Sequence, residues 1–393
     1  MKLSKTSLTG LLAAVGLSTA QAQTVVHITG STAFRAATVN AITHILKPGF
    51  TYGYAGTSFT GANQAIFTGT TITNSIPVII KTSWTGSVAG VQTVSQQLPV
   101  STWLTNTTPQ SVSGTPSAPA VYDSPAVPEV DMDDGVQSTT PFPSPVLVAQ
   151  NVGAVCFKWV ASKGAPAGLT NMTPNTVQAL WLNGSLPLAL FTGVPADEAS
   201  SVFAIGRDPD SGTRDTAFSE SGVGPFTTVV QYYPTNASGA VISRTAAGPI
   251  TGQELVPAET VDGIFFDVGD GGYSSGGDLA VAMEQTTAAI GGYYVTYLGI
   301  SDSVTALGGG AVELGWNGVR FSDIAVQEGS YTFWAFEHLC YRSNYGTVDA
   351  NGKTVADLLA TQIKNVDAIA AGELLSSMHV TRAVEGGLVT PTY

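Results

Sequence analysis

The stretch VFAIGRDPDSGTR, at residues 202–214, decides the fold. It begins with the apolar run Val202–Ile205, which predicts a buried strand. A glycine and a proline-containing turn follow directly. The small residues Ser211, Gly212 and Thr213 then favour the start of a helix, because hydroxyl side chains cap helix N-termini. A strand that passes through a short turn into a helix is the unit from which α/β folds are built.

The same strand–turn–helix pattern recurs outward from this stretch in both directions. Apolar patterning predicts strands at residues 24–29, 76–80, 145–160 and 202–205 and from 289, and helices at 33–46, from 174, and at 279–285, 333–336 and 355–369. The run at 145–160 is typical of strands buried on both faces of a parallel sheet. Residues 93–128, rich in Ser, Thr and Pro, predict a long surface excursion. We therefore expect an α/β protein with largely parallel strands.

The first residues predict an export signal. Lys2 and Lys5 precede a short apolar stretch, and Ala20-Gln21-Ala22 closes it as cleavage sites do, so we expect residues 1–22 to be removed. Nothing later in the chain offers about 18 uninterrupted apolar residues, which excludes membrane insertion. No cysteine near the cleavage site is placed to carry a lipid. The mature protein is expected to be periplasmic or secreted.

The net charge of the chain indicates which classes of partner it can bind. The chain has a formal net charge of −13, only 11% of its residues are charged, and no cluster of Lys and Arg occurs in it. An acidic surface repels polyanions and has few counterions to release, so nucleic acid is excluded as a partner. Any anion that binds must be held by local groups.

Catalytic and cofactor chemistry have little support in the sequence. Cys156 and Cys340 stand in apolar runs without a CxxC or Cys/His pairing, so no metal or cofactor is expected. An oxidising compartment permits a disulfide between them, and two buried free thiols are the equal alternative. The serines lack a Gly-x-Ser-x-Gly elbow with His and acid partners. We therefore expect no enzyme and no catalytic residue.

Small hydroxyl residues stand beside glycine at four predicted strand-to-helix turns. They are Gly30-Ser31-Thr32, Gly86-Ser87, Ser211-Gly212-Thr213 and Ser274-Ser275-Gly276-Gly277. Such turns suit anions, because the first N–H groups of a helix lack partners and the helix dipole places partial positive charge there. The alternative is that each hydroxyl only caps its own helix.

Arg207 adds a full positive charge to one of these turns. It follows the strand directly and stands four residues before Ser211, so its guanidinium can turn back toward the helix start and hold an oxyanion with two hydrogen bonds. Asp208 or Asp210 could orient it. The alternative is an ordinary surface Arg–Asp pair.

The segment Ile205–Asp215 resembles the Arg-x-x-x-Ser-Gly-Thr signature of the phosphate-binding proteins of ABC transporters, which have the type-two periplasmic binding fold. Residues 29–34 are similar to the family's N-terminal phosphate loop, 86–90 to its second serine loop, and 277–293 to its late helix–strand segment. The resemblance extends over most of the chain. It implies the ligand-binding residues Ser31, Thr32, Ala33, Phe34, Ser87, Asp134, Arg207, Ser211, Gly212 and Thr213.

Asp134 has a separate role in that set. The run Val130-Asp131-Met132-Asp133-Asp134 resembles the family's strand-end Ser-Asp element, with Asp133 standing where serine is usual. A carboxylate accepts a proton from phosphate and repels fully ionised sulfate, so the resemblance implies that Asp134 selects between these anions.

The resemblance implies a two-lobed α/β fold in which mixed sheets are flanked by helices and the ligand lies between the lobes. We expect lobe one at 23–146 and 298–393 and lobe two at 147–297, with crossings near residues 146 and 297. The function implied is that of an exported solute-binding protein that holds an inorganic oxyanion, phosphate above others, for uptake through an ABC transporter permease. The alternative is an extracellular structural or adhesive protein built on the same fold.

Overall fold

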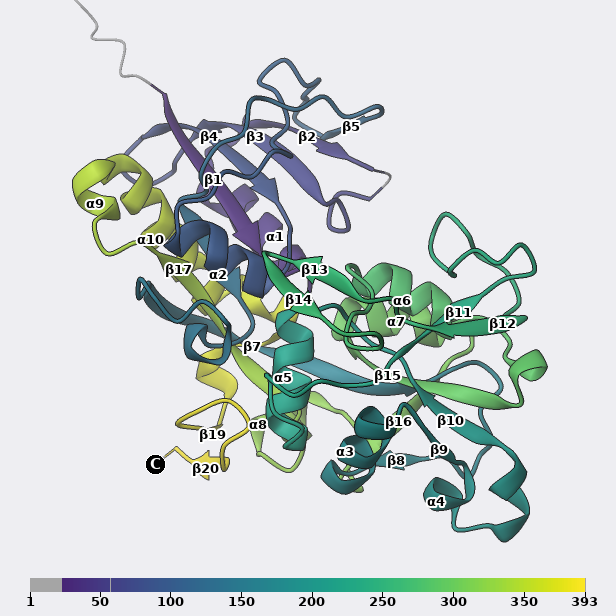
Figure 1. Ribbon diagram of the computed structural model, residues 1–393. Helices are drawn as coiled ribbons and strands as arrows, with labels where there is room; N and C mark the ends of the chain where they lie inside the picture. Colours follow the sequence, from purple (N-terminus) through teal and green to yellow (C-terminus); the bar gives the residue numbers. More distant parts are fainter. Residues whose placement is uncertain (1–22, 57, 393) are drawn as a thin grey trace, which may run out of the picture.

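The computed structural model describes residues 23–56 and 58–392, so the predicted export signal lies outside the described residues. Figure 1 shows a large mixed sheet with helices packed on it. The main path through the sheet runs β5-β2-β3-β4-β1-β6-β17-β7-β15-β10-β9, and β16, β18 and β8 pair beside it. Within the described residues, no helix has the length and hydropathy needed to cross a bilayer.

The strands of this sheet are β1 (Thr24–Gly30), β2 (Thr51–Ala55), β3 (Gln64–Thr70), β4 (Pro77–Ser83), β5 (Thr115–Ser117), β6 (Val130–Asp133), β7 (Val148–Ala161), β8 (Asn171–Met172), β9 (Ser185–Pro187), β10 (Ser201–Ala204), β15 (Gly292–Gly299), β16 (Val312–Trp316), β17 (Trp334–Tyr341) and β18 (Gly372–Glu373). Small antiparallel pairs are formed by β11 (Tyr232–Thr235) with β12 (Gly252–Leu255), β13 (Glu259–Val261) with β14 (Ile264–Phe266), and β19 (Val380–Thr381) with β20 (Thr390–Pro391).

The helices are α1 (Arg35–Ile45), α2 (Ser87–Ser95), α3 (Pro174–Asn183), α4 (Ala189–Thr192), α5 (Gly212–Ser221), α6 (Gly276–Met283), α7 (Ile300–Gly308), α8 (Asp323–Gln327), α9 (Tyr345–Val348) and α10 (Ala350–Asn365). They cover both faces of the sheet. Around β1 and β6, α2 packs on one face and α1 with α10 on the other; around β15, α3 and α5 lie opposite α6 and α7. This is the flanked mixed sheet that the sequence predicts.

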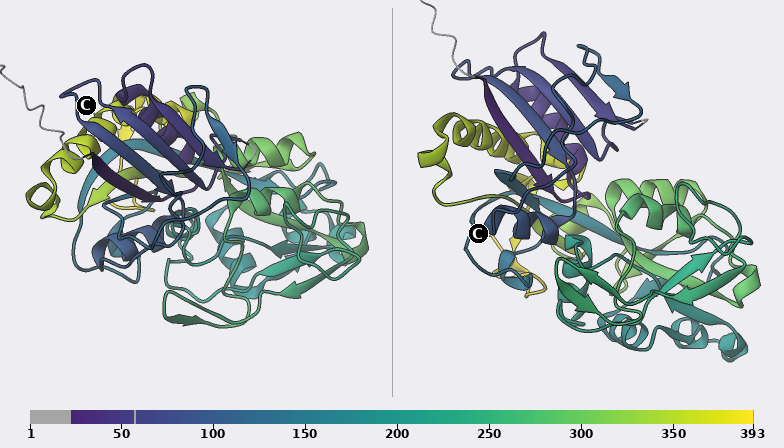
Figure 2. Two further views of the ribbon diagram at one scale, coloured as in Figure 1. Left: turned by 90° about the horizontal axis from the view of Figure 1, so that it is seen from above. Right: turned by 45° about the horizontal axis from the view of Figure 1, so that its top comes forward.

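Strand β7 joins the two ends of the sheet. Its residues Val148–Cys156 pair with β17, and Phe157–Ala161 pair with β15 and β16, all antiparallel. Figure 2 shows the elements that it joins as two groups, one with β1–β5, α1 and α10, the other with β9–β15, α3 and α5–α7. The expectation of a parallel setting for residues 145–160 is therefore wrong. Parallel pairing occurs elsewhere, between β1 and β4, β1 and β6, β2 and β5, β8 and β16, and β10 and β15. Antiparallel pairs outnumber these in the sheet, so the expectation of largely parallel strands is also wrong.

The predicted helix at 333–336 is also wrong, because these residues enter strand β17. A short apolar run has the same pattern whether it is a buried helix turn or a buried strand, and only its pairing with β6 and β7 decides. The helix predicted from residue 174 is confirmed. Thr173 caps α3 by accepting a hydrogen bond from Thr176 N, and Pro174 is the first helical residue.

An aromatic cluster fixes the second half of β7. The ring of Trp159 lies 5.6 Å from Trp181, 5.7 Å from Tyr297 and 5.1 Å from Phe333, measured between centroids. All four rings are buried. Each such pair contributes about 0.5–1.5 kcal/mol beyond the area it buries, so β7, β15 and α3 are held as one rigid block.

Cys156 and Cys340 are both buried free thiols, which is one of the two alternatives left open by the sequence.

Candidate functional site

The starts of α1, α2 and α5 come together although they are distant in sequence. Gly86, before α2, donates its N–H to the carbonyl oxygen of Gly30 at the end of β1 (3.0 Å). The N–H of Val88 donates to the carbonyl oxygen of Asp210 in the turn before α5 (3.0 Å). The turn before α2 therefore contacts the two other turns that the sequence singled out for anion binding, those before α1 and α5. Their helix dipoles bring partial positive charge to one region.

Asp134 lies between α2 and α5. The hydroxyl of Ser87 donates to its Oδ1, and the hydroxyl of Thr213 donates to its Oδ2 at 3.3 Å. The Thr216 hydroxyl donates to its carbonyl oxygen at 2.8 Å. All four residues are buried. The structure thus brings together three predicted site residues, with Asp134 as the common acceptor.

Gly212 lies against the same pair of groups. A Cβ at this position would overlap Asp134 Oδ1 and approach Ser87 Oγ at 2.5 Å. Only glycine allows the first turn of α5 to come this close. Because the first four N–H groups of a helix have no intrahelical partner, the backbone of Gly212 and Thr213 offers donors next to the carboxylate.

Arg207 reaches the site from the end of β10. It is buried, with 3% of its surface exposed; its Nε donates to the carbonyl oxygen of Tyr273 (2.9 Å) and its Nη2 to that of Ser274 (3.0 Å). The guanidinium is therefore oriented by the turn before α6. The expectation that Asp208 or Asp210 orients it is wrong: among the described residues, Arg207 forms no ion pair closer than 4 Å.

The protonation of Asp134 depends on these neighbours. Burial raises its pKa above the usual range, and the hydrogen bond from Ser87, the charge of Arg207 and the hydrogen bond from Thr213 act in the opposite direction. A carboxyl group with such opposing influences responds to the charge of what binds beside it.

Two other predicted hydroxyls accept N–H groups close to them in sequence. Ser31 Oγ accepts the N–H of Phe34 (3.1 Å), and Ser211 Oγ accepts the N–H of Arg214 (3.3 Å). Ser211 thereby caps α5, which is the alternative left open for that turn, whereas Ser31 bonds within the turn before α1, whose N-cap is Phe34. Ala33 is buried, and it lies against Gly299, the residue before α7. A Cβ added at Gly299 would lie 3.2 Å from the Cβ of Ala33. Thr32 is half-buried beside it.

Two arginines near this region were missed by the sequence argument. Arg35, the first residue of α1, donates to Asn63 Oδ1 at 2.8 Å, and Arg244 pairs with Asp278 at 3.1 Å. Asp302, in the first turn of α7, is buried, and burial raises its pKa. The positive charges of Arg35, Arg207 and Arg244 lower the pKa of this carboxyl group. A signal was present at Arg35, because a cation at a helix N-terminus opposes the dipole and needs a compensating partner.

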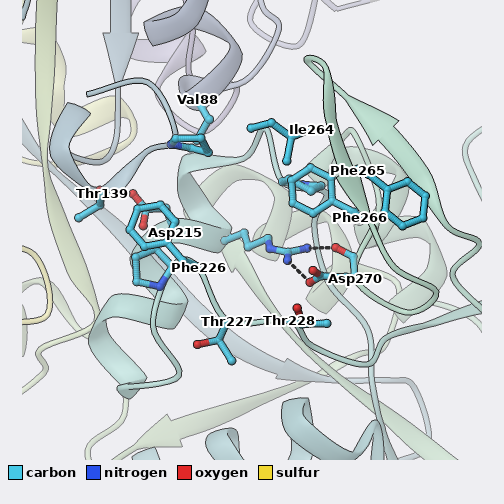
Figure 3. Close-up of a pocket in the computed structure, with 14 residues that line it drawn as sticks. Val88, Thr139, Asp215, Phe226, Thr227, Thr228, Ile264, Phe265, Phe266 and Asp270 are labelled. Atoms are coloured by element: carbon cyan, nitrogen blue, oxygen red, sulfur yellow. Dashed lines mark hydrogen bonds and ion pairs between the residues drawn. The ribbon is translucent and has the colours of Figure 1, made fainter. Parts of the chain in front are cut away.

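A cavity of about 330 Å³ adjoins the site along α5 (Figure 3). Its apolar wall comes from Ile264 to Phe266 of β14 and from Phe226. Arg214 faces it but is held by Asp270, with 2.6 Å between Nη2 and Oδ1, so its charge is neutralised within the fold. Arg214 therefore forms an ion pair inside the protein, whereas the guanidinium of Arg207 donates to two backbone carbonyl oxygens.

No protein-family model matches this chain, and no curated protein matches its sequence. Solved structures match its three-dimensional structure. A substrate-binding protein assigned to phosphate ABC transport from Clostridium perfringens, with bound phosphate, is 13% identical over 87% of this chain and 97% of its own, with a TM-score of 0.46. An ABC-type phosphate transport receptor from Vibrio cholerae is 11% identical over 89% and 99%, with a TM-score of 0.46. PstS from Borrelia burgdorferi is 12% identical over 88% and 94%, with a TM-score of 0.40.

The first two are described as phosphate-transport proteins, the class that the sequence resembles. At this similarity they assign no role to individual residues of this chain. The roles of the site residues rest on the contacts given above.

Proposed function

We propose that this protein is an exported solute-binding protein that holds an inorganic oxyanion, phosphate above others, between the starts of α2 and α5. The observation that carries the proposal is the meeting of Ser87, Asp134 and Thr213, with Arg207 acting on the same carboxyl group. Helix N–H groups and hydroxyls supply donors, the guanidinium supplies charge, and Asp134 supplies an acceptor.

The proposal assigns the two sides of the site to two lobes, 23–146 with 298–393 and 147–297. Ser87 and Asp134 come from the first, and Arg207, Ser211, Gly212 and Thr213 come from the second. Opening would separate α2 from α5, and closing would bury the anion between them and exclude water. Closure around a ligand is what a transporter permease can distinguish from the open receptor, so handover to an ABC transporter completes the proposal.

Asp134 gives the site its choice of anion. In the closed arrangement its carboxylate accepts the hydroxyl hydrogens of Ser87 and Thr213. A protonated phosphate oxygen can donate to that carboxylate and accept the hydroxyls in its place, whereas sulfate has no proton to donate at neutral pH. Sulfate would therefore leave two negative groups facing each other without a hydrogen bond.

Calorimetric titration of residues 23–393, stripped of bound anion, tests the function. Phosphate is expected to bind with a Kd at or below the micromolar range, arsenate to bind with similar geometry, and sulfate to bind at least about 100-fold more weakly, a difference of about 2.7 kcal/mol. Molybdate, which is larger, serves as a size control. Absence of binding to every oxyanion would overturn the proposal and favour a structural role for the fold.

Changing Asp134→Asn is expected to lower the preference for phosphate over sulfate by at least about tenfold, or about 1.4 kcal/mol. The amide keeps the size of the side chain and its contact with Ser87 but removes the charge that repels sulfate. The ratio of the two Kd values measures the effect, with Asp197→Asn, on a separate short helix, as the control. An unchanged ratio would remove Asp134 from the site.

A further inference from the structure

Four polar side chains share one face of the sheet beneath α2. In the antiparallel pairing of β6 with β17, Asp131 stands opposite Cys340 and Asp133 opposite His338. Side chains alternate between faces along a strand, and directly opposed residues point the same way. Cys340 packs with Val94 of α2, which places this face under that helix.

We propose that Asp131, Asp133 and Cys340 bind a divalent transition-metal ion of the zinc class. One ligand atom from each residue, two carboxylate oxygens and a sulfur, lies within 4.8 Å of the others. Ligands at about 2.0–2.3 Å from one tetrahedral ion lie about 3.3–3.8 Å apart, so rotation of these side chains by a small amount closes them on a single ion.

The carboxylate oxygens of Asp131 and Asp133 that lack hydrogen-bond partners support an ion at this place. Asp131 is 0% exposed, and neither of its carboxylate oxygens has a partner in the structure. Asp133 uses Oδ1 to accept the N–H of Gly135 (3.0 Å), but its buried Oδ2 has no partner either. Buried carboxylates without partners are strongly destabilising. The fold makes room for this one, because a Cβ at Gly30 or Gly90 would overlap Asp131 Oδ1.

Protonation alone does not resolve this. Burial and the neighbouring carboxylates raise the pKa values of Asp131 and Asp133. A proton removes the charge of Asp131, yet it leaves the other carboxyl oxygen without a donor. A divalent ion offsets the charge of both carboxylates and ligates their oxygens at once, and it also favours the thiolate form of a coordinating cysteine.

An ion can reach the cluster from outside. A cavity of about 270 Å³ is lined by Asp133, His338 and Cys340 and also by Val146, which is 74% exposed. The cavity has room for water to complete the coordination of the ion. Because the ligands include one thiolate, zinc and cobalt are favoured over calcium and magnesium, which prefer oxygen ligands alone.

Loading residues 23–393 with Co²⁺ tests the site without reference to anion binding. We expect one cobalt ion per chain by elemental analysis and a thiolate-to-cobalt charge-transfer absorption in the near ultraviolet, both lost on addition of Zn²⁺. Cys340→Ser is expected to abolish the absorption. Cys156→Ser is the matched control, since Cys156 is an equally buried thiol without this cluster, and it should leave the absorption unchanged.

Asp131→Asn provides a second variant that keeps the thiol. It is expected to weaken Co²⁺ binding at least about tenfold, because even the loss of an outer-shell partner of a metal ligand costs about 10–100-fold in affinity. Circular dichroism verifies that each variant is folded. A folded wild-type protein that binds no cobalt, or an absorption that survives Cys340→Ser, would overturn the proposal and leave protons as the only counter-charge.

Discussion

Changing Arg207→Ala is expected to weaken phosphate binding at least about 100-fold. Arg207 is buried, its charge lowers the pKa of the Asp134 carboxyl group, and its guanidinium is fixed by two carbonyl oxygens before any ligand arrives. Removing one partner of a buried charge pair typically costs about 2–5 kcal/mol in binding. Calorimetric titration with phosphate measures the change.

The fold of this variant should persist. Arg207 lies outside the apolar core, and the bonds it loses are two hydrogen bonds to turn carbonyls, a cost of about 1–3 kcal/mol. Arg207→Lys keeps the charge without the forked geometry and should bind with intermediate affinity. Arg320→Ala, on the surface, is the control. Unfolding of Arg207→Ala, or an unchanged Kd, would show that Arg207 holds the structure together and does not hold the ligand.

The second large effect concerns stability against pH. Burial raises the pKa of Asp208 to about 6, that of Asp215 to about 7, that of Glu385 to about 8 and that of Asp210 to about 9. In the unfolded chain such groups titrate near pH 4. Between pH 4 and 9 the folded protein therefore binds protons that the unfolded chain has released, and the free energy of unfolding falls as the pH rises.

Asp215 alone contributes about 4 kcal/mol to this fall, from a displacement of about three pH units. That contribution is fully present below pH 4 and is lost as the pH rises to about 7. Denaturant unfolding at pH 5 and pH 8, in the presence of a chelator, measures it. Asp215→Asn should flatten the profile between pH 4 and 7, while Glu198→Gln, on the surface, should not. A wild-type protein that is more stable at pH 8 than at pH 5 would contradict the prediction.

Local patterns predicted the elements of the fold better than their pairing. The strand into α5 and the Thr173 cap of α3 were visible because the turn and cap residues are adjacent in sequence. The antiparallel setting of β7 was not, since an apolar run has the same composition whichever way its neighbours run. Strand β17 was mistaken for a helix for a related reason: four apolar residues do not distinguish the two periods.

The site was predicted in part. Ser87, Asp134 and Thr213 were named from a resemblance, and their hydrogen bonds join segments 47 and 79 residues apart that no local rule connects. The role of Asp208 and Asp210 was predicted wrongly, because sequence proximity to Arg207 does not determine where a long side chain points. The Asp131, Asp133 and Cys340 cluster had a signal that was overlooked. Two aspartates alternating within a buried strand conflict with burial unless something neutralises them.

Strand β7 makes the two halves of this molecule depend on each other for a closed sheet. A fragment without residues 148–161 would leave one edge of β17 unpaired, and a fragment that began after them would leave β15 and β16 with open edges. Open edges of this kind pair with other chains and aggregate. The full chain covers these edges with β7, so truncation on either side of residues 148–161 is expected to turn a folded protein into an aggregating one.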